Sequence, residues 1–305
     1  MSASDLQGSA RADSPGDAIV PEKRRRSRLR QFLANPSGAI GLAIVVCHVL
    51  IALIGPLIVP YDFAVQDVDA VLQPPSAAHW FGTDLLGRDV LTRTLLGGRQ
   101  AMLICTIATA IAMVWGGILG IFLALVGGWI DNIVMRCADA LMSMPWILFV
   151  MIFVAALGTG TAALMPILGV SYGLSVVYLA RSAAMDFVTK DFVLAAQARG
   201  ERRTTIALRE LLPNVRDSLA VQAAMQWSWM ILGVSSLSYL GFGVPPPAPD
   251  WGLMIADARG VMATAPWTVV FPIAALSSLI IGANLAVDTA AKTLGVDRND
   301  AKAGR

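Results

Sequence analysis

The feature that most constrains this chain is a set of five long stretches that contain no Asp, Glu, Lys or Arg. Each stretch exceeds the roughly 20 apolar residues that an α-helix needs to cross a bilayer. Charged residues make up 14% of the chain, against about 25% in an ordinary soluble domain. The pattern predicts an all-α integral membrane protein and excludes a soluble enzyme. The five stretches are residues 31–61, 100–130, 140–180, 218–249 and 260–287.

The stretch at 140–180 is about twice as long as one span requires. Near its middle lies the sequence Gly158-Thr159-Gly160-Thr161, which is typical of a chain reversal. We therefore predict a helical hairpin in this stretch and one helix in each of the other four. The six predicted spans are residues 38–59, 101–126, 140–157, 162–181, 219–243 and 267–288.

The distribution of basic residues predicts the orientation of these spans. Lys and Arg concentrate at 23–30 and again at 181–216, between the fourth and fifth spans, whereas 62–99 is rich in Asp. Cytoplasmic loops of membrane proteins carry an excess of Lys and Arg. We therefore predict that both termini are cytoplasmic and that 62–99 and 245–266 face the outside.

The basic cluster at 23–30 has two other interpretations. A signal peptide ends at a small-residue cleavage site, whereas here a full span follows and no obvious site of that kind ends it. Binding of nucleic acid is not needed to explain the cluster, because the anionic inner leaflet attracts it. We predict a retained first span, a lipid bilayer as the partner of the cluster, and no nucleic-acid partner.

The sequence lacks the common motifs of a nucleotide or metal site. No Gly-Lys pair occurs, so a phosphate-binding loop of the G-x-x-x-x-G-K-[ST] type cannot form. The two histidines and three cysteines do not have the spacing of metal ligands. We therefore predict no catalytic residue, metal or cofactor in this chain, and transport that is powered by another protein.

The segment 191–214 contains two short amphipathic stretches in the basic loop. Gly200 permits a sharp turn between them, and Pro213 is expected to end the second. A helix, a hinge and a second helix between two spans are typical of docking into a groove of a soluble partner. A solvated basic loop without a partner is the alternative. The apolar faces are assigned to Phe192, Ala195 and Ala196 in the first stretch and to Ile206, Leu208, Leu211 and Leu212 in the second.

This segment resembles the EAA loop of binding-protein-dependent ABC importer permeases. Leu194 stands where the family usually has an acidic residue, and Arg199 where an apolar residue is common. The resemblance implies that the loop contacts the ATPase, but without the acidic side chain at 194. The implied coupling residues are Ala195, Ala196, Gly200, Glu201, Arg202, Arg203, Ile206, Leu212 and Pro213.

A second stretch, from His79 to Arg93, resembles the H-P-F-G-T-D-x-x-G-R-D signature of the second permease in dipeptide, oligopeptide and nickel importers. Trp80 replaces the usual Pro. Thr83 or Asp84 is expected to cap a helix that follows and lies along the outer face. The apolar side of this helix is assigned to Val90, Leu91, Leu95 and Leu96. The residues of this extracytoplasmic motif are Phe81, Gly82, Thr83, Asp84, Gly87, Arg88 and Asp89.

A third stretch, from Leu237 to Gly252, resembles the L-S-F-L-G-x-G-x-x-P-P-x-P-x-W-G run of the same subfamily, and Ala265-Pro266-Trp267 matches its later A-P-W. Its prolines predict an extended, non-helical exit from the fifth span.

Together the resemblances imply the type I ABC importer permease fold in the cytoplasmic (inner) membrane. They imply a homologous permease subunit as partner, two ATPase subunits or domains that bind ATP and Mg, and an extracytoplasmic substrate-binding protein that delivers di- or oligopeptides. Nickel or another small solute is the alternative cargo, and an ATP-independent secondary transporter is the alternative class. The implied layout is a cytoplasmic tail at 1–37, the first span with an extracytoplasmic segment at 38–98, a core permease domain at 99–288 and a second tail at 289–305.

Polar side chains inside spans are costly where they face lipid, so they are expected to face protein or a cavity. Hydrogen bonding between helices is the alternative role for each. Met142, Met144 and Pro145 could add an adaptable, kinked lining, although ordinary packing explains them as well. The predicted pathway residues are Tyr172, Ser175, Gln222, Gln226 and Asn284.

Overall fold

The computed structural model describes residues 28–295, and this part of the chain is built from helices and loops. The basic residues at 23–27 and the tail at 296–305 lie outside the described residues. A 3₁₀ turn, η1, spans Val68–Ala70, and a π-helical turn, η2, spans Ala207–Leu211. The α-helices are α1 (Arg28–Ala34), α2 (Pro36–Ile58), α3 (Val90–Val126), α4 (Gly128–Met142), α5 (Trp146–Leu157), α6 (Thr161–Val188), α7 (Asp191–Ala198), α8 (Arg203–Ile206), α9 (Leu212–Tyr239), α10 (Trp251–Ala258) and α11 (Trp267–Leu294).

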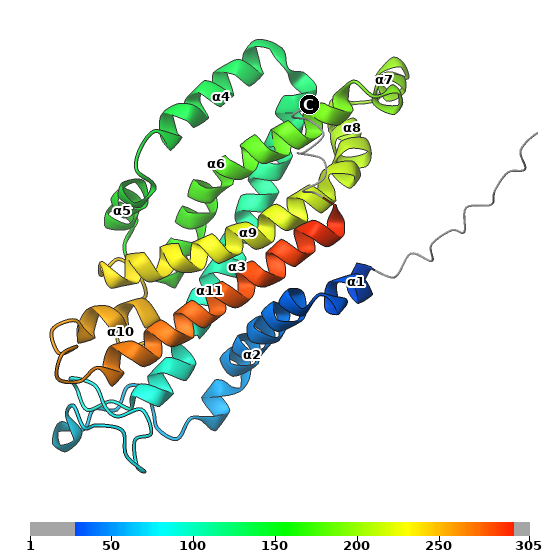
Figure 1. The fold of residues 1–305 in the computed structure, drawn as a ribbon. Helices are drawn as coiled ribbons and strands as arrows, with labels where there is room; N and C mark the ends of the chain where they lie inside the picture. Colours follow the sequence, from blue (N-terminus) through cyan, green and yellow to red (C-terminus); the bar gives the residue numbers. More distant parts are fainter. Residues whose placement is uncertain (1–27, 296–305) are drawn as a thin grey trace, which may run out of the picture.

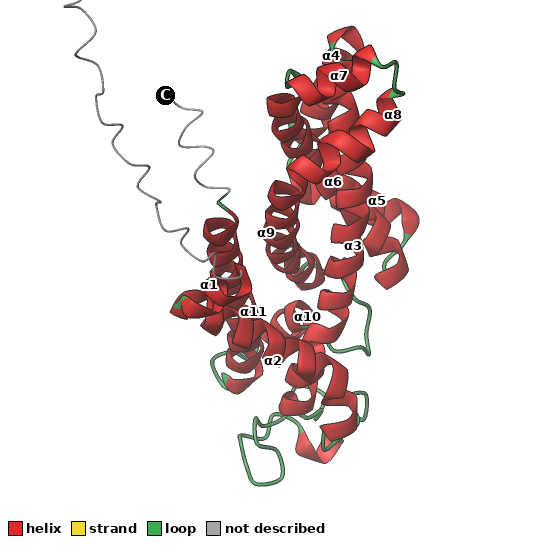
Figure 2. Ribbon diagram, turned by 90° about the vertical axis from the view of Figure 1, so that its right-hand side faces the viewer, coloured by secondary structure: helices red, strands yellow, loops and turns green. Residues whose placement is uncertain are grey.

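The long helices run side by side, with α7 and α8 at one end and α10 with the loop before α3 at the other (Figure 1). These are called below the α7 end and the α10 end. The most extensive contact joins α3 to α6, and the next joins α2 to α11. Helix α5 packs on α6 at the outer edge of the bundle, on the side away from α1 (Figure 2).

Small residues allow the long helices to approach closely. A Cβ added at Gly120 of α3 would lie 2.5 Å from the carbonyl oxygen of Val177 in α6. A Cβ at Gly41 of α2 would lie 2.6 Å from the carbonyl oxygen of Gly282 in α11. Such close backbone approach is typical of helix pairs packed inside membranes.

The all-helical prediction is confirmed, and length and composition support four single spans, α2, α3, α6 and α11. A fifth results if α4 and α5 are counted together. Helix α9 has 28 residues, or about 42 Å at 1.5 Å per residue, so it is long enough to cross a membrane. It is less apolar than the four single spans, and composition does not identify it as a span. The count of six spans is therefore supported only in part.

The predicted span at 140–157 contains a break. Helix α4 ends at Met142, α5 begins at Trp146, and the two are bent by 87°. Pro145 precedes α5 and disfavours helical geometry at the residue before it, which accounts for the interruption. Helix α4 is held to α6 by a bidentate ion pair in which both guanidinium contacts from Arg181 to Asp131 measure 2.6 Å.

The separate surface helix expected after the extracytoplasmic motif is wrong. Residues 90–126 form one continuous helix of 37 residues, and Val90 and Leu96 are buried instead of lying along an outer face. The glycine pair Gly97 and Gly98 does not interrupt the helix. Both glycines pack against the indole of Trp251. The proposed layout boundary between 98 and 99 falls inside this helix.

Candidate coupling loop, extracytoplasmic motif and pathway

The segment 191–214 has the predicted arrangement of a helix, a turn and a second helix. Gly200 follows α7 with φ +72°. Its N–H donates to the carbonyl of Gln197, and the N–H of Glu201 donates to the carbonyl of Ala196. This pair of bonds is the Schellman motif, whose left-handed position favours glycine. Nothing lies within 4 Å of a Cβ added there, so backbone conformation and not crowding explains the glycine.

The predicted apolar faces of the two short helices are partly wrong. Val193 and Ala196 face the bundle in α7, whereas Phe192 and Ala195 are exposed. Leu208 in η2 is also exposed, at 52%. The buried side joins a cluster at the α7 end that includes Ile121, Ala184, Ile206, Leu211 and Val215.

Pro213 does not end a helix. It is the second residue of α9 and follows directly after the π-helical turn η2, and the helical backbone runs on without interruption from α8 through η2 into α9. The π-helical turn is the local feature that the sequence did not indicate. As a result, the second short helix is an extension of α9.

The face of this loop that points away from the bundle is apolar and basic. Phe192 and Leu194 are 38% and 48% exposed, and the side chains of Arg202 and Arg203 are exposed beside the turn. Arg199 contacts Glu201 at 2.7 Å across Gly200. A preformed turn with exposed apolar and cationic side chains has the properties of a docking surface.

The extracytoplasmic motif forms a tight loop around Asp84. Its carboxylate accepts from the backbone N–H groups of Leu86 and Arg88, at 2.8 and 3.0 Å, and from Arg88 Nε at 2.7 Å. Gly87 has φ +71° within this loop. The expected cap at Thr83 or Asp84 is wrong, because Asp89 caps α3 by accepting from the N–H of Thr92 at 2.8 Å.

Other residues of this motif attach it to the far end of the chain. The indole Nε1 of Trp267 donates to the carbonyl of Thr83 at 3.1 Å. Phe81 stacks on Phe271 of α11, with ring centroids 3.7 Å apart. A Cβ added at Gly82 would lie 2.7 Å from the Trp267 indole. The motif therefore fastens the loop before α3 to the start of α11.

Trp251 connects α10 to α3. Its indole lies against Gly97 and Gly98, where added Cβ atoms would come within 2.7 and 2.4 Å of the ring. Its Nε1 donates to the carbonyl of Thr94 at 2.8 Å. The preceding Asp250 caps α10 through the N–H of Leu253 and is fully buried, which raises the pKa of its carboxyl to about 6.

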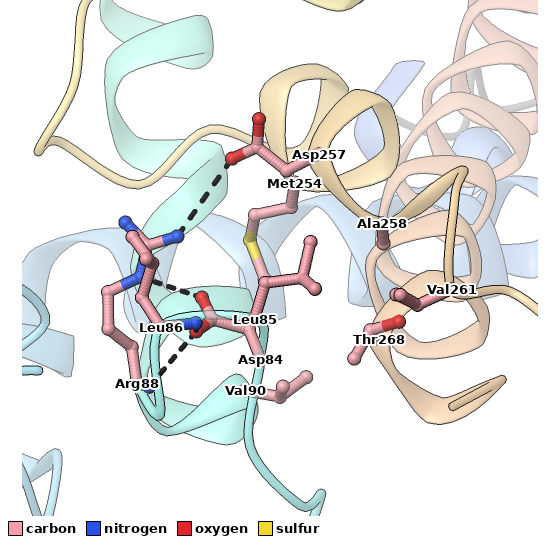
Figure 3. Close-up of a pocket in the computed structure, with 10 residues that line it drawn as sticks. All are labelled: Asp84, Leu85, Leu86, Arg88, Val90, Met254, Asp257, Ala258, Val261 and Thr268. Carbon is pink, nitrogen blue, oxygen red and sulfur yellow. Dashed lines mark hydrogen bonds and ion pairs between the residues drawn. The ribbon is translucent and has the colours of Figure 1, made fainter. Parts of the chain in front are cut away.

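A cavity of about 250 Å³ separates this motif from α10 (Figure 3). Arg88 lies at one side of it, between Asp84 and Asp257, whose carboxylate is 3.9 Å from the guanidinium. Partial burial raises the pKa of Asp257, and the neighbouring Arg88 opposes that rise. The apolar lining of this cavity includes Leu85, Leu86, Val90, Met254, Ala258 and Val261.

Three of the predicted pathway residues line a second cavity, of about 310 Å³, between α5, α6 and α9. They are Tyr172, Ser175 and Gln226. Ser175 Oγ donates to Gln226 Oε1 at 3.3 Å. The remaining walls are aromatic and sulfur-containing side chains, among them Met142, Met144, Trp146, Phe149 and Trp229.

The other two predicted pathway residues are placed differently. Gln222 donates from Nε2 to Gln226 Oε1 at 3.3 Å and lines a larger cavity towards the α7 end. Asn284 accepts from Ser228 Oγ at 2.8 Å and so joins α9 to α11. Asn284 therefore has the interhelical role that the sequence left open.

The described residues contain no group of three His, Cys, Asp or Glu side chains that could hold a metal ion. The sequence Gly169-Val-Ser-Tyr-Gly173 has the spacing of a G-x-S-x-G nucleophile turn. However, it lies inside α6, and Ser171 Oγ donates to the carbonyl of Ile167 at 2.8 Å. A serine bound within a continuous helix is not presented on a sharp turn, so this motif carries no nucleophile.

Comparison with known proteins places these features in a family. Residues 116–295 match the model of the binding-protein-dependent transport system inner membrane component, and residues 25–75 match the N-terminal transmembrane domain of oligopeptide transport permease C. The chain is 32% identical over 274 residues, 90% of each protein, to the dipeptide transport system permease protein DppC of Alkalihalophilus pseudofirmus. It is 30% identical to the oligopeptide permease protein OppC of Bacillus subtilis over 91% of this chain and 92% of that one. It is 33% identical to a probable D,D-dipeptide permease protein, DdpC, of Escherichia coli over 88% and 91%. With more than half of its length matched to the permease model and relatives that are similar almost end to end, the chain belongs to the binding-protein-dependent transport system inner membrane components.

Proposed function

We propose that this chain is the C-type permease subunit of an ABC importer for peptides. The observation that carries the proposal is the similarity, over about 90% of both chains, to a relative named for dipeptide transport. The relatives described above are named for dipeptides, oligopeptides and D,D-dipeptides, which favours peptides over nickel as the cargo. A homologous permease would complete the route, a binding protein would deliver the peptide from outside, and two ATPase subunits or domains would bind ATP and Mg²⁺.

Within this complex the loop at 191–214 would transmit ATPase movement to the spans. Its second helix continues into α9, which carries Gln222 and Gln226. A displacement of the loop would therefore move the helix that lines both cavities. We propose that Tyr172, Ser175, Gln226 and Gln222 lie along the route, with alternating access between the two membrane faces.

The test of this function is uptake of tritiated alanyl-alanine and tri-alanine into proteoliposomes that contain the assembled transporter. Uptake should require the binding protein and enclosed ATP, and it should stop when the ATPase is inactivated. Uptake that persists without a working ATPase would instead indicate a secondary transporter. Uptake of nickel alone would contradict the proposed substrate class.

The proposed topology has six spans in the inner membrane, with the α7 end on the cytoplasmic side. The spans are α2, α3, the α4–α5 pair, α6, α9 and α11. A Cys introduced at Asp67 or Arg259 of a Cys-free protein should react with an impermeant thiol reagent added outside intact cells. A Cys at Arg203 should react only after permeabilisation. All three positions are exposed, whereas Asp250, in the same outer segment as Arg259, is buried and unsuitable. Labelling of position 203 in intact cells would contradict this topology.

A further inference from the structure

A large cavity opens among the ends of three long helices at the α7 end. Its volume is about 750 Å³, within the range of about 300 to 1,000 Å³ that small-molecule sites occupy. The walls come from the C-terminal parts of α6 and α11 and the N-terminal part of α9. Uncharged polar residues of the lining are Ser182, Asn214, Ser218 and Gln222.

Two carboxylates and two ammonium groups line this same cavity. Asp186 lies in the last turn of α6, and Lys190 follows in the short link to α7. Asp288 and Lys292 lie four residues apart on α11. Within residues 28–295, none of the four makes an ion pair shorter than 4.0 Å. The cavity therefore offers charges of both signs that the described fold does not use.

This cavity is also connected to the proposed route. Gln222 lies in its wall and donates to Gln226, whose side chain lines the cavity of about 310 Å³ next to Tyr172 and Ser175. The smaller cavity is mostly aromatic and contains no Asp, Glu, Lys or Arg among its lining residues. A substrate that moves towards the α7 end would pass from uncharged walls to walls that carry both signs.

We propose that the charged cavity is a binding site for a zwitterionic peptide on the inner side of the permease. Asp186 and Asp288 would bind the terminal ammonium group, and Lys190 and Lys292 the terminal carboxylate. Each contact would be charge-assisted, and the four residues together recognise the one feature that all unmodified linear peptides share. The site accepts peptides of different side chains because only their termini are recognised. This inference rests on the proposed function and its topology.

The test is binding of tritiated tri-alanine to the assembled transporter in phosphatidylcholine nanodiscs, without nucleotide and without the binding protein. The wild-type complex should bind tri-alanine, and N-acetyl-tri-alanine amide should bind at least about tenfold more weakly, since both of its termini are uncharged. The double variant Asp288→Asn, Lys292→Gln should lose about tenfold in affinity for tri-alanine and should not discriminate against the blocked peptide. Arg216→Gln, on the exposed surface of α9 outside the cavity lining, is the matched control and should bind as the wild type does.

Three results would overturn the inference while binding-protein-dependent uptake, measured separately, continued to support the proposed function. The first is equal affinity of the wild type for the free and blocked peptides. The second is unchanged affinity in the double variant. The third is binding that is seen in phosphatidylcholine but lost in phosphatidylethanolamine nanodiscs, which would assign the cavity to a lipid headgroup. Loss of uptake in the wild type would instead contradict the proposed function itself.

Discussion

Gly200→Val is expected to abolish the ATP hydrolysis that the binding protein stimulates, while the subunit still inserts into the membrane. Gly200 has φ +72°, a conformation that costs an ordinary residue about 1 to 2 kcal/mol, and a β-branched side chain is especially unfavourable there. The strain is relieved only if the Schellman turn opens, which changes the direction of residues 201–206. Because the loop would lie outside the bilayer, insertion does not depend on it.

The measurement is stimulated hydrolysis in proteoliposomes, together with co-purification of the ATPase. Gly200→Asn is the matched control, since Asn tolerates the left-handed conformation better than other residues with a Cβ, and the space around Gly200 is open. This variant should keep most of the activity. Wild-type values for Gly200→Val in both assays would show that the turn does not transmit ATPase movement.

Trp251→Ala should destabilise the subunit by about 3 to 5 kcal/mol, the usual cost of removing a large buried aromatic side chain. The indole is 3% exposed, fills the space above Gly97 and Gly98, and donates to the carbonyl of Thr94. Its loss leaves a cavity between α10 and α3 and an acceptor without its partner.

This effect is measured as a lower temperature of thermal unfolding for the purified complex in detergent. Trp80→Ala is the matched control, because the Trp80 side chain is 69% exposed in the neighbouring loop before α3. It should shift the unfolding temperature little. Equal shifts for the two variants would contradict the structural role assigned to Trp251.

The positions of the long helices could be predicted because stretches without charge are long and few. The helix boundaries were less predictable. The break before α5 follows from Pro145, but charge and length alone did not indicate that α4 would turn away by 87°. Helix α9 was predicted from the absence of charge, yet its glutamines and serines make it the least apolar of the long helices, so composition alone does not identify it as a span.

For the coupling loop, the turn could be predicted and the buried face could not. Gly200 indicated a change of direction because glycine readily adopts a positive φ. The sequence Asp191-Phe-Val-Leu-Ala-Ala is apolar on nearly every side, so its periodicity does not distinguish Phe192 from Val193. Contact of α7 with α6, α8 and η2 decides that Val193 is buried. Similarly, Asp89 caps α3 instead of Asp84 because the carboxylate of Asp84 is already used by Arg88 and two backbone N–H groups.

The π-helical turn at Ala207–Leu211 sets the rotation of α8 relative to α9 about the helix axis. An α-helix advances by about 100° per residue, and a π-helical turn accommodates one extra residue within a single turn. The azimuth of α8 and of the hinge before it, relative to the cavity-lining face of α9, is therefore fixed by the number of residues in η2 as well as by side-chain contacts. Relaxation of η2 to ordinary α-helix would rotate α8 relative to α9 about their common axis, without bending α9.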